Sequence, residues 1–308
     1  MNRDTDHLGV ASRRSDQAGG GTGGIVVLRS PAGATPAGTT PTGRPDHESV
    51  GHPTSIVREP CDLEIIVPAY NEEHRISSSL QEIVRYLATR TDLSTGVVVV
   101  DNGSADRTAE IVDSLVDDPQ VPVSVIGCSE PGKGAAVRRG VATSRARYVG
   151  FCDADLATPI EALEDVLREL DAGRPVVIGS RRCEGASYTV PQTRRRRAAG
   201  WLFRRQTRDL SGTVADTQCG FKFFDLAAAR ELFDDIRTTG FVFDLELIAR
   251  ARAAGLPVTE VPVAWSDQDG SSLHPLRDGP SIAADLRLIR SMYLTPNGRP
   301  ALRVPERT

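Results

Sequence analysis

Short, wholly apolar segments that alternate with amphipathic ones dominate the first regular part of this chain. Val97–Val100 is a run of valines, and Tyr148–Cys152 is similarly apolar. Between such segments, Ile76–Leu87 and Pro159–Leu170 carry apolar residues at helical spacing. Strands that are apolar on both faces are typical of a parallel sheet covered by helices on both sides. The sequence therefore predicts an α/β fold with a mostly parallel, doubly wound sheet.

The same patterns predict the remaining elements. The expected strands are Leu63–Pro68, Val121–Ile126, Val176–Ile178 and, at a sheet edge, Val258–Val263. The expected helices are Ala105–Val116, Lys133–Ser144 and Ile282–Tyr293, and a strand with two helices is expected within residues 221–254. Residues 181–210 form a basic segment.

The ends of the chain differ in composition from this regular part. Residues 1–57 are rich in Gly, Ser, Thr, Pro, Arg and Asp, and they bury too little apolar surface to offset the entropy of ordering. We expect a disordered tail there, one domain over residues 58–293, and a flexible tail over residues 294–308.

Composition narrows the class of protein. The net charge of −4 argues against general nucleic-acid binding, so no nucleic-acid partner is expected. Five scattered cysteines without a Cys-x-x-Cys pair fit neither a disulfide framework nor a zinc site. There is no apolar run of the ~18–20 residues that a membrane span needs, and no apolar core of a signal peptide. A cytoplasmic location is expected.

Acidic side chains follow several of the predicted strands. Asp153 and Asp155 come directly after the strand Tyr148–Cys152, Asp101 follows the valine run, and Glu72 follows the first strand. Each could simply cap the next helix. However, the carboxyl ends of parallel strands meet at one edge of a sheet, where ligands bind, and paired carboxylates repel each other unless a cation or donor lies between them.

Motifs in the second half resemble a known family when they are combined with these strand ends. They are Asp-Thr-Gln-Cys-Gly-Phe-Lys-Phe-Phe over residues 216–224, Phe-Asp-Leu-Glu-Leu over residues 243–247, and Val-Ala-Trp over residues 263–265. In this order they resemble family 2 glycosyltransferases of the GT-A nucleotide-diphospho-sugar transferase fold over about residues 62–293. The nearest likeness is to dolichyl- or polyprenyl-phosphate β-glucosyltransferases, because Ala157 stands where related mannosyl transferases often carry Gln.

The resemblance implies a donor site in residues 58–180 and an acceptor half in residues 181–293. The implied nucleotide-sugar contacts are Pro68, Tyr70, Glu72, Asp101, Lys133, Asp153 and Asp155. Asp153 and Asp155 would hold Mg²⁺ or Mn²⁺, which favour oxygen ligands. Lys133, between two glycines at a helix start, would contact phosphate.

The implied reaction inverts the configuration of the transferred sugar. The candidate catalytic residues are Asp155, Arg181, Asp216, Lys222 and Asp244. Asp216 or Asp244 could act as a base for an alcohol acceptor, although each could equally anchor a loop. A lipid phosphate would need no strong base, because its second pKa of about 6 leaves it anionic at neutral pH.

The expected activity is transfer of glucose from UDP-glucose to a polyprenyl phosphate at the cytoplasmic face of the membrane. Basic clusters flank Trp201–Phe203 within residues 194–205, and this pattern predicts peripheral attachment to the membrane. The alternatives are a soluble small-molecule acceptor, GDP-mannose as donor, and a nucleotide-sugar-binding protein without catalysis. Self-association into a homo-oligomer is a further possible partnership.

Overall fold

A seven-stranded sheet in the order β3-β2-β1-β4-β7-β5-β8 organises the part of the chain that the structure describes. This computed structural model describes residues 59–115, 121–188, 194–266, 275–295 and 301. The strands are β1 (Leu63–Ala69), β2 (Thr95–Asp101), β3 (Val123–Gly127), β4 (Tyr148–Cys152), β5 (Val176–Ser180), β7 (Phe221–Asp225) and β8 (Val258–Pro262). The predicted disordered tail, residues 1–57, and nearly all of the predicted C-terminal tail lie outside the described residues.

Only β7 runs against its neighbours in this sheet. It pairs antiparallel with β4 and β5, whereas the other four strand pairs are parallel. The prediction of a mostly parallel sheet is confirmed. Gly150 of β4 lies opposite Phe223 of β7, and a Cβ atom on Gly150 would lie 2.0 Å from the Phe223 ring. The glycine therefore makes room for the aromatic ring in the sheet.

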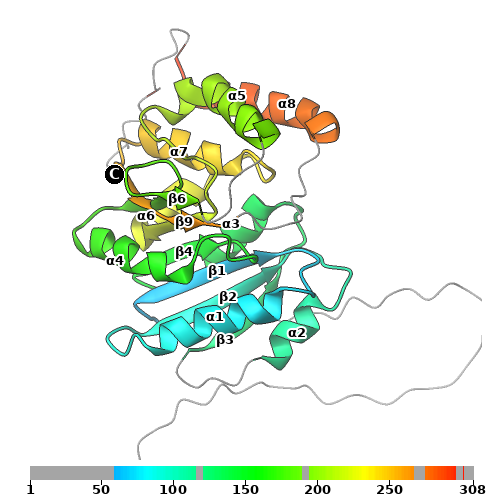
Figure 1. Cartoon of the computed structure of the whole chain (residues 1–308), viewed down its shortest axis with the longest axis vertical. Coiled ribbons are helices and arrows are strands. Elements are labelled where there is room, and N and C mark those ends of the chain that lie inside the picture. Colours follow the sequence, from blue (N-terminus) through cyan, green and yellow to red (C-terminus); the bar gives the residue numbers. More distant parts are fainter. Residues whose placement is uncertain (1–58, 116–120, 189–193, 267–274, 296–300, 302–308) are drawn as a thin grey trace, which may run out of the picture. The chain divides into compact units, whose positions relative to one another are not determined.

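Helices cover both faces of the sheet (Figure 1). One face carries α1 (Ile76–Ala88), α2 (Thr108–Ser114) and α4 (Leu163–Asp171). The opposite face carries α3 (Lys133–Thr143), α6 (Leu226–Phe233) and α7 (Phe243–Ala253). This arrangement makes the sheet doubly wound, as its apolar strands predict.

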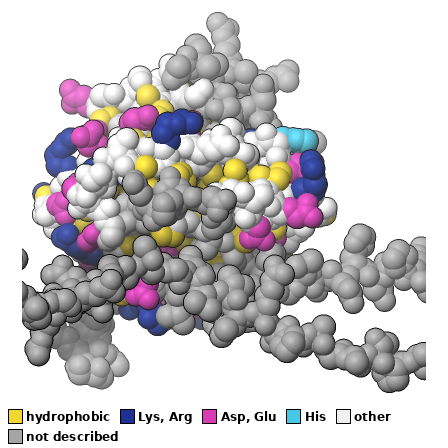
Figure 2. Space-filling view, turned by 90° about the horizontal axis from the view of Figure 1, so that it is seen from below, with side chains coloured by type: hydrophobic (Ala, Val, Ile, Leu, Met, Phe, Trp, Pro, Cys, Tyr) yellow, Lys and Arg dark blue, Asp and Glu magenta, His cyan; other side chains and the backbone are white. Residues whose placement is uncertain are grey.

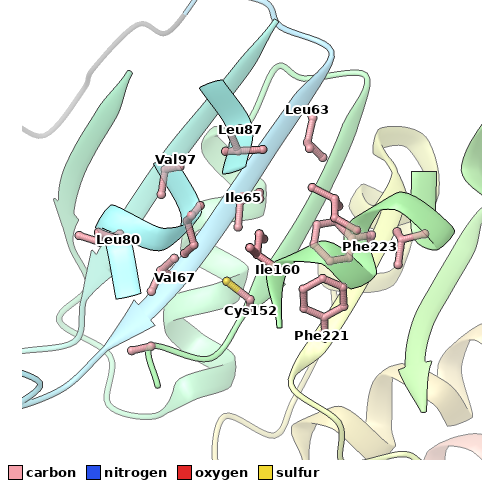
Figure 3. Close-up of a cluster of buried hydrophobic side chains, with 14 of the residues drawn as sticks. Leu63, Ile65, Val67, Leu80, Leu87, Val97, Cys152, Ile160, Phe221 and Phe223 are labelled. Atoms are coloured by element: carbon pink, nitrogen blue, oxygen red, sulfur yellow. The ribbon is translucent and has the colours of Figure 1, made fainter. Parts of the chain in front are cut away.

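Alternate residues of the strands build the two apolar layers. On the α1 side, Ile65 and Val67 of β1 pack with Leu80 of α1 and with Phe221 and Phe223 of β7 (Figure 3). The intervening Ile66 of β1 belongs to the other layer. Because each strand is buried on both faces, the valine-rich runs show no polar alternation.

A second helical layer covers α7. Helices α5 (Arg194–Ser211) and α8 (Pro275–Tyr293) pack on α7 and on each other (Figure 1). They share an apolar cluster that includes Leu210, Leu245 and Ile289. Arg290 of α8 binds Asp209 of α5 through a 2.7 Å ion pair. The sheet and its flanking helices thus support α5, which carries much of the basic segment.

Several element boundaries differ from the sequence-based prediction. The helix expected from Ala105 begins at Thr108, because Asp106 accepts hydrogen bonds from the backbone and hydroxyl of Thr108 and holds the preceding turn. The helix expected from Pro159 begins with a 3-10 turn, Ile160–Ala162. A two-stranded ribbon, β6 (Ser187–Tyr188) with β9 (Ala264–Trp265), was not predicted.

The apolarity of the helices and the distribution of charge on the surface can also be described. Among the described residues, no helix combines the length and apolarity needed to cross a bilayer. On the face shown in Figure 2, basic and acidic side chains are interspersed around hydrophobic ones. The described part of that face therefore carries no extended field of one sign.

Candidate active site

The predicted site residues meet at one edge of the sheet. The carboxyl ends of β1, β2, β4 and β5 lie there because these strands are parallel, and antiparallel β7 brings its amino end to the same edge. Cys152 at the end of β4 pairs with Phe221 at the start of β7. The backbone N–H of Asp153 then donates to the carbonyl of Gly220 at 3.1 Å. This pairing joins the donor half predicted from the sequence to the acceptor half.

Two lysines and two aspartates form a connected network at this edge. The Lys133 ammonium lies 2.5 Å from Asp153 Oδ1 and 3.9 Å from Asp244 Oδ2. The other oxygen of Asp244 lies 2.6 Å from Lys222 Nζ, which also donates to the carbonyl of Cys219. Lys222 is fully buried, so the charge on Asp244 offsets the cost of burying this ammonium.

The ammonium of Lys133 is held between carboxylates and aromatic rings. It lies 5.4 Å from the centre of the Phe151 ring and 5.7 Å from that of Phe243. Burial lowers the pKa of Lys133, but the charges of Asp153 and Asp244 outweigh this effect and raise the pKa above its ordinary value. The network therefore keeps a positive charge beside Asp153.

Asp155 lies in a more strained electrostatic environment. Burial, followed by repulsion from Asp153, raises the pKa of the Asp155 carboxyl above its ordinary value. Burial is also the main cause that raises the pKa of Glu72, and the Asp155 charge adds to the effect. Arg75 offsets part of this through its 2.5 Å ion pair with Glu72. Excess negative charge between β1 and β4 favours a bound cation.

The repulsion between Asp153 and Asp155 is compatible with the divalent ion predicted for this pair. No cluster of three or more His, Cys, Asp or Glu side chains able to hold a metal occurs among the described residues. The described residues thus offer a carboxylate pair rather than a complete ligand cage. Mg²⁺ commonly binds in this way, through one or two carboxylates with water and substrate phosphates completing its shell.

Arg181 and Asp216 form a separate ion pair beyond β5. Arg181 donates from Nε at 2.6 Å and from Nη2 at 2.8 Å to the two oxygens of Asp216, and its backbone N–H adds a third bond at 3.0 Å. These bonds outweigh the effect of burial and lower the pKa of Asp216 to about 2. The Arg181 guanidinium also lies 5.2 Å from the centre of the Trp265 ring.

Glu260 of β8 holds the backbone that carries Asp216 of this ion pair. Its carboxylate accepts hydrogen bonds from the backbone N–H groups of Ala215 and Asp216, at 2.9 and 3.1 Å. Glu260 was not among the site residues predicted from the sequence. An acidic residue in the middle of the predicted strand Val258–Val263 was the available signal, because a charged group in a sheet strand needs partners.

At two glycines of the site, neighbouring groups lie so close to the backbone that no side chain would fit. Gly132 has φ +116°, and a Cβ atom there would lie 2.3 Å from the carbonyl oxygen of Thr239. A Cβ atom on Gly220 would lie 1.9 Å from the carboxylate of Asp153. Side chains at either position would displace the groups that surround Lys133 and Asp153.

A buried carboxylate holds the loop beyond α6, which contacts the start of α3. Glu246 of α7 is fully buried and accepts from the backbone of Arg237, from the backbone and hydroxyl of Thr238, and from the hydroxyl of Tyr293. The adjoining carbonyl of Thr239 accepts the N–H of Gly134 at 2.9 Å. Glu246 was part of a quoted motif but was not predicted to be a site residue.

The remaining predicted residues line the β1 and β2 side of the edge. Pro68 is a half-buried residue of β1, and Tyr70 is 61% exposed just beyond that strand. Asp101 is the buried last residue of β2 and accepts the N–H of Ser104 at 3.3 Å. Glu72 donates its N–H to Thr108, which ties the two strand ends together.

The doubly wound sheet, with carboxylates and the Lys133 ammonium gathered at one edge, defines an α/β fold that is similar to solved structures. Glucosyl-3-phosphoglycerate synthase of Mycobacterium tuberculosis, solved with Mn²⁺ and UDP-glucose, matches with a TM-score of 0.56 and 19% identity over 75% of this chain and 79% of that one. The same synthase solved with UDP also gives a TM-score of 0.56. At this identity the likeness shows the fold alone, which is the predicted GT-A fold.

Sequence comparison defines the family. Residues 64–233 match the family described as glycosyl transferase family 2. The dolichyl-phosphate β-glucosyltransferase of Dictyostelium discoideum is 34% identical over 75% of each chain, and that of Saccharomyces cerevisiae is 30% identical over 75% of each chain. The chain therefore belongs to glycosyl transferase family 2 and is an enzyme. The resemblance drawn from its motifs is confirmed.

Proposed function

We propose that this enzyme transfers glucose from UDP-glucose to a polyprenyl phosphate. The observation that carries the proposal is the meeting of Asp153, Asp155 and Lys133 at the carboxyl edge of the sheet, with Arg181 beyond β5. The names of the curated relatives support glucose as the sugar and a lipid phosphate as the acceptor.

The donor diphosphate would bind at the β4 end of the site. Asp153 and Asp155 would hold Mg²⁺ or Mn²⁺, which when bound neutralises charge on the departing diphosphate. Lys133 begins α3, where unpaired backbone N–H groups also favour phosphate. Exchange of the Lys133–Asp153 contact for a Lys133–phosphate contact would free Asp153 for the metal. The side chains of Lys133 and Asp153 are partly exposed, which permits this exchange.

The acceptor would attack without a strong general base. A phosphate oxygen of the acceptor forms a bond to the anomeric carbon of glucose, the bond from that carbon to the UDP oxygen breaks, and its electron pair leaves with UDP. Attack from the opposite side inverts the anomeric centre. The phosphate oxygen is already anionic near neutral pH, so no side chain needs to remove a proton.

The five candidate catalytic residues would then have different roles. Asp216 would position Arg181, because three hydrogen bonds from Arg181 already occupy its oxygens. Lys222 and Asp244 would form the buried support beneath Lys133. Arg181 and Lys133 would bring two anionic substrates together, and Asp155 would act through the metal.

Helix α5 would attach the enzyme to a cytoplasmic membrane surface. It begins with four arginines, and Trp201 and Leu202 are 56% and 50% exposed. Exposed aromatic and aliphatic side chains beside a basic cluster suit an interface with anionic headgroups. This arrangement would bring the acceptor half close to a lipid substrate.

Transfer of radiolabel tests the proposal directly. The protein is incubated in detergent with undecaprenyl phosphate, Mg²⁺ or Mn²⁺, and either UDP-[¹⁴C]glucose or GDP-[¹⁴C]mannose. We expect label in the organic phase from UDP-glucose only, and loss of the signal with EDTA. Label from GDP-mannose alone would overturn the donor assignment. UDP release that requires a cell extract, without labelled lipid, would favour a soluble acceptor.

A further inference from the structure

A basic cavity opens beside α5, and its lining includes none of the carboxylates assigned to the donor. It has a volume of about 560 Å³ and lies between the second half of α5 and the loop over residues 211–217. Arg204, Arg205 and Arg208 line it together with Trp201, and none of the described residues that line it is acidic. Cavities of this size hold small ligands or the headgroups of larger ones.

The cations around the cavity are crowded without matching carboxylates. A Cβ atom on Gly200 would lie 3.3 Å from Arg204 Nη1 and 3.8 Å from Arg182 Nη2, so both guanidinium groups lie near this position of α5. Burial and repulsion from Arg182 lower the pKa of Arg204 below its ordinary value. Arginines gathered in this way are stabilised by a bound anion, and their planar donors match the oxygens of phosphate.

The acidic groups near the cavity are already engaged by other partners. Asp216 binds Arg181, Asp209 binds Arg290, and Glu260 accepts two backbone N–H groups. Within the described part of the chain, no ion pair is recorded for Arg204, Arg205 or Arg208. An external anion would therefore not have to displace a carboxylate of the described residues from an ion pair with these three arginines.

The cavity lies between the exposed apolar residues of α5 and the edge of the sheet that carries the candidate site. Trp201, with the Arg205 guanidinium 5.5 Å from its ring centre, lies on the same helix as exposed Leu202. Thr217 lines the cavity three residues before Gly220, whose carbonyl binds the N–H of Asp153. Three residues of backbone span at most about 11 Å, so the cavity wall lies near the donor site.

We propose that this cavity binds a phosphate group carried by a lipid. Its arginines would hold the phosphate oxygens, while Trp201 and Leu202 contact the apolar chain. The lipid could be the polyprenyl phosphate acceptor or an anionic phospholipid of the membrane. Use of the site by the acceptor rests on the proposed function, whereas binding of the phosphate group does not.

Equilibrium binding tests the proposal without turnover. The full chain in detergent at fixed ionic strength is titrated calorimetrically with farnesyl phosphate, farnesol, dihexanoyl phosphatidylglycerol and inorganic phosphate. We expect a phosphate-bearing lipid to bind at least tenfold more tightly than farnesol or inorganic phosphate. Tighter binding of farnesyl phosphate identifies the acceptor as the source, and tighter binding of phosphatidylglycerol identifies the membrane. Binding of inorganic phosphate alone, or of no ligand, overturns the proposal.

Charge-matched variants assign the binding to the cavity. R204Q/R205Q/R208Q should weaken lipid phosphate binding at least tenfold, whereas R85Q/R139Q/R145Q, with the same loss of charge on other surfaces, should change it less than twofold. T213E adds a negative charge to an exposed position of the lining and should also weaken binding, without removing an α5 arginine. Equal binding by T213E and the wild-type protein would overturn the assignment.

Separate measurement of transfer distinguishes this proposal from the proposed function. Binding of farnesyl phosphate with no transfer from UDP-glucose to any polyprenyl phosphate would leave the cavity assigned and reject the activity. Normal transfer with no loss of lipid binding in R204Q/R205Q/R208Q and T213E would leave the activity and reject the cavity.

Discussion

At the residue scale, neighbouring carboxylates in this site differ because their partners differ. Asp216 is enclosed by donors from Arg181, which lower its pKa, whereas burial and the charge of Asp153 raise the pKa of Asp155. A group stabilised by an internal cation is suited to structural support. A carboxyl that is buried beside another negative charge is suited to hold an external cation.

Replacement of Asp155 by Asn should separate activity from stability. We expect a loss of roughly 10²–10³-fold in kcat/KM, the scale on which a single group that stabilises developing charge acts. The melting temperature should stay unchanged or rise, because the variant removes repulsion from Asp153. Asp113→Asn, an exposed change on α2, serves as the control. Full turnover of D155N with unaltered metal dependence would refute the ligand assignment.

The Arg181–Asp216 pair should make stability depend on acidic pH. The pKa of Asp216 falls from 3.8 to about 2 on folding. Since a pKa shift of one unit corresponds to about 1.4 kcal/mol, the shift of Asp216 contributes about 2 kcal/mol to the free energy of unfolding. This contribution is complete above about pH 4 and is lost as the pH falls toward 2. Urea unfolding between pH 2.5 and pH 7 measures this change.

The variant D216N should lose that pH dependence and leave a largely buried arginine unpaired. We expect the free energy of unfolding at pH 7 to fall by roughly 3–5 kcal/mol, the range observed when one partner of a buried ion pair is removed. The matched control is D92N, because Asp92 binds Arg90 with similar bidentate geometry but is exposed. Equal effects of the two variants at pH 7 would show that burial does not set the strength of this pair.

At the element scale, the start of α3 depends on close contact with the loop beyond α6. Gly132 approaches the Thr239 carbonyl, and Glu246 of α7 holds Thr238 in place. Lys133 follows directly and contacts Asp153. The geometry of this helix start is therefore built by tertiary contacts and not by the Gly-Lys-Gly sequence alone.

Replacement of Gly132 by Ala should weaken donor binding. A Cβ atom would meet the Thr239 carbonyl and displace Lys133, so we expect UDP affinity to fall about tenfold or more, through loss of helix N-terminal and lysine contacts. Gly173→Ala is a matched control, because Gly173 has φ +83° with no atom within 4 Å of the added Cβ. It should cost roughly 1–2 kcal/mol in unfolding and retain UDP affinity. An equal loss of UDP affinity in both variants would show that general destabilisation of the fold, and not the contact with Thr239, weakens donor binding.

At the scale of the whole molecule, α5 and α8 form an outer layer supported by α7. Their apolar residues are buried against α7, while Trp201, Leu202 and Leu288 remain among the exposed large hydrophobic residues. The layer therefore presents one apolar side inward and a mixed basic and apolar surface outward. A surface of this kind fits a membrane interface.

Replacement of Arg194–Arg197 by serine should release the protein from anionic vesicles. At about 1 kcal/mol for each basic residue near the surface, the partition coefficient should fall by roughly 10²–10³-fold. Co-sedimentation with phosphatidylglycerol vesicles measures the change, and neutral phosphatidylcholine vesicles provide the comparison. Unchanged sedimentation with anionic vesicles would refute attachment through this segment.

Local pattern in the sequence determined the strands of the central parallel sheet, its doubly wound arrangement and the acidic strand ends. A strand buried on both faces must be apolar throughout, and parallel strands must bring their carboxyl ends to one edge. The prediction for Tyr148–Cys152 matches β4 at both ends for this reason. The family motifs added the expectation that residues 216–247 complete the site.

Tertiary structure alone decided which charges pair with which. Arg181 is 35 residues from Asp216, and Lys133 lies on a different element from Asp153 and Asp244. Neither spacing nor composition specifies these pairs, because they depend on the antiparallel insertion of β7 between β4 and β5. The same insertion sets Gly220 against Asp153, and the packing of α5 on α7 places the arginine-lined cavity beside the acceptor half. Long-range contacts of this kind arise from packing of whole elements, which local sequence pattern does not encode.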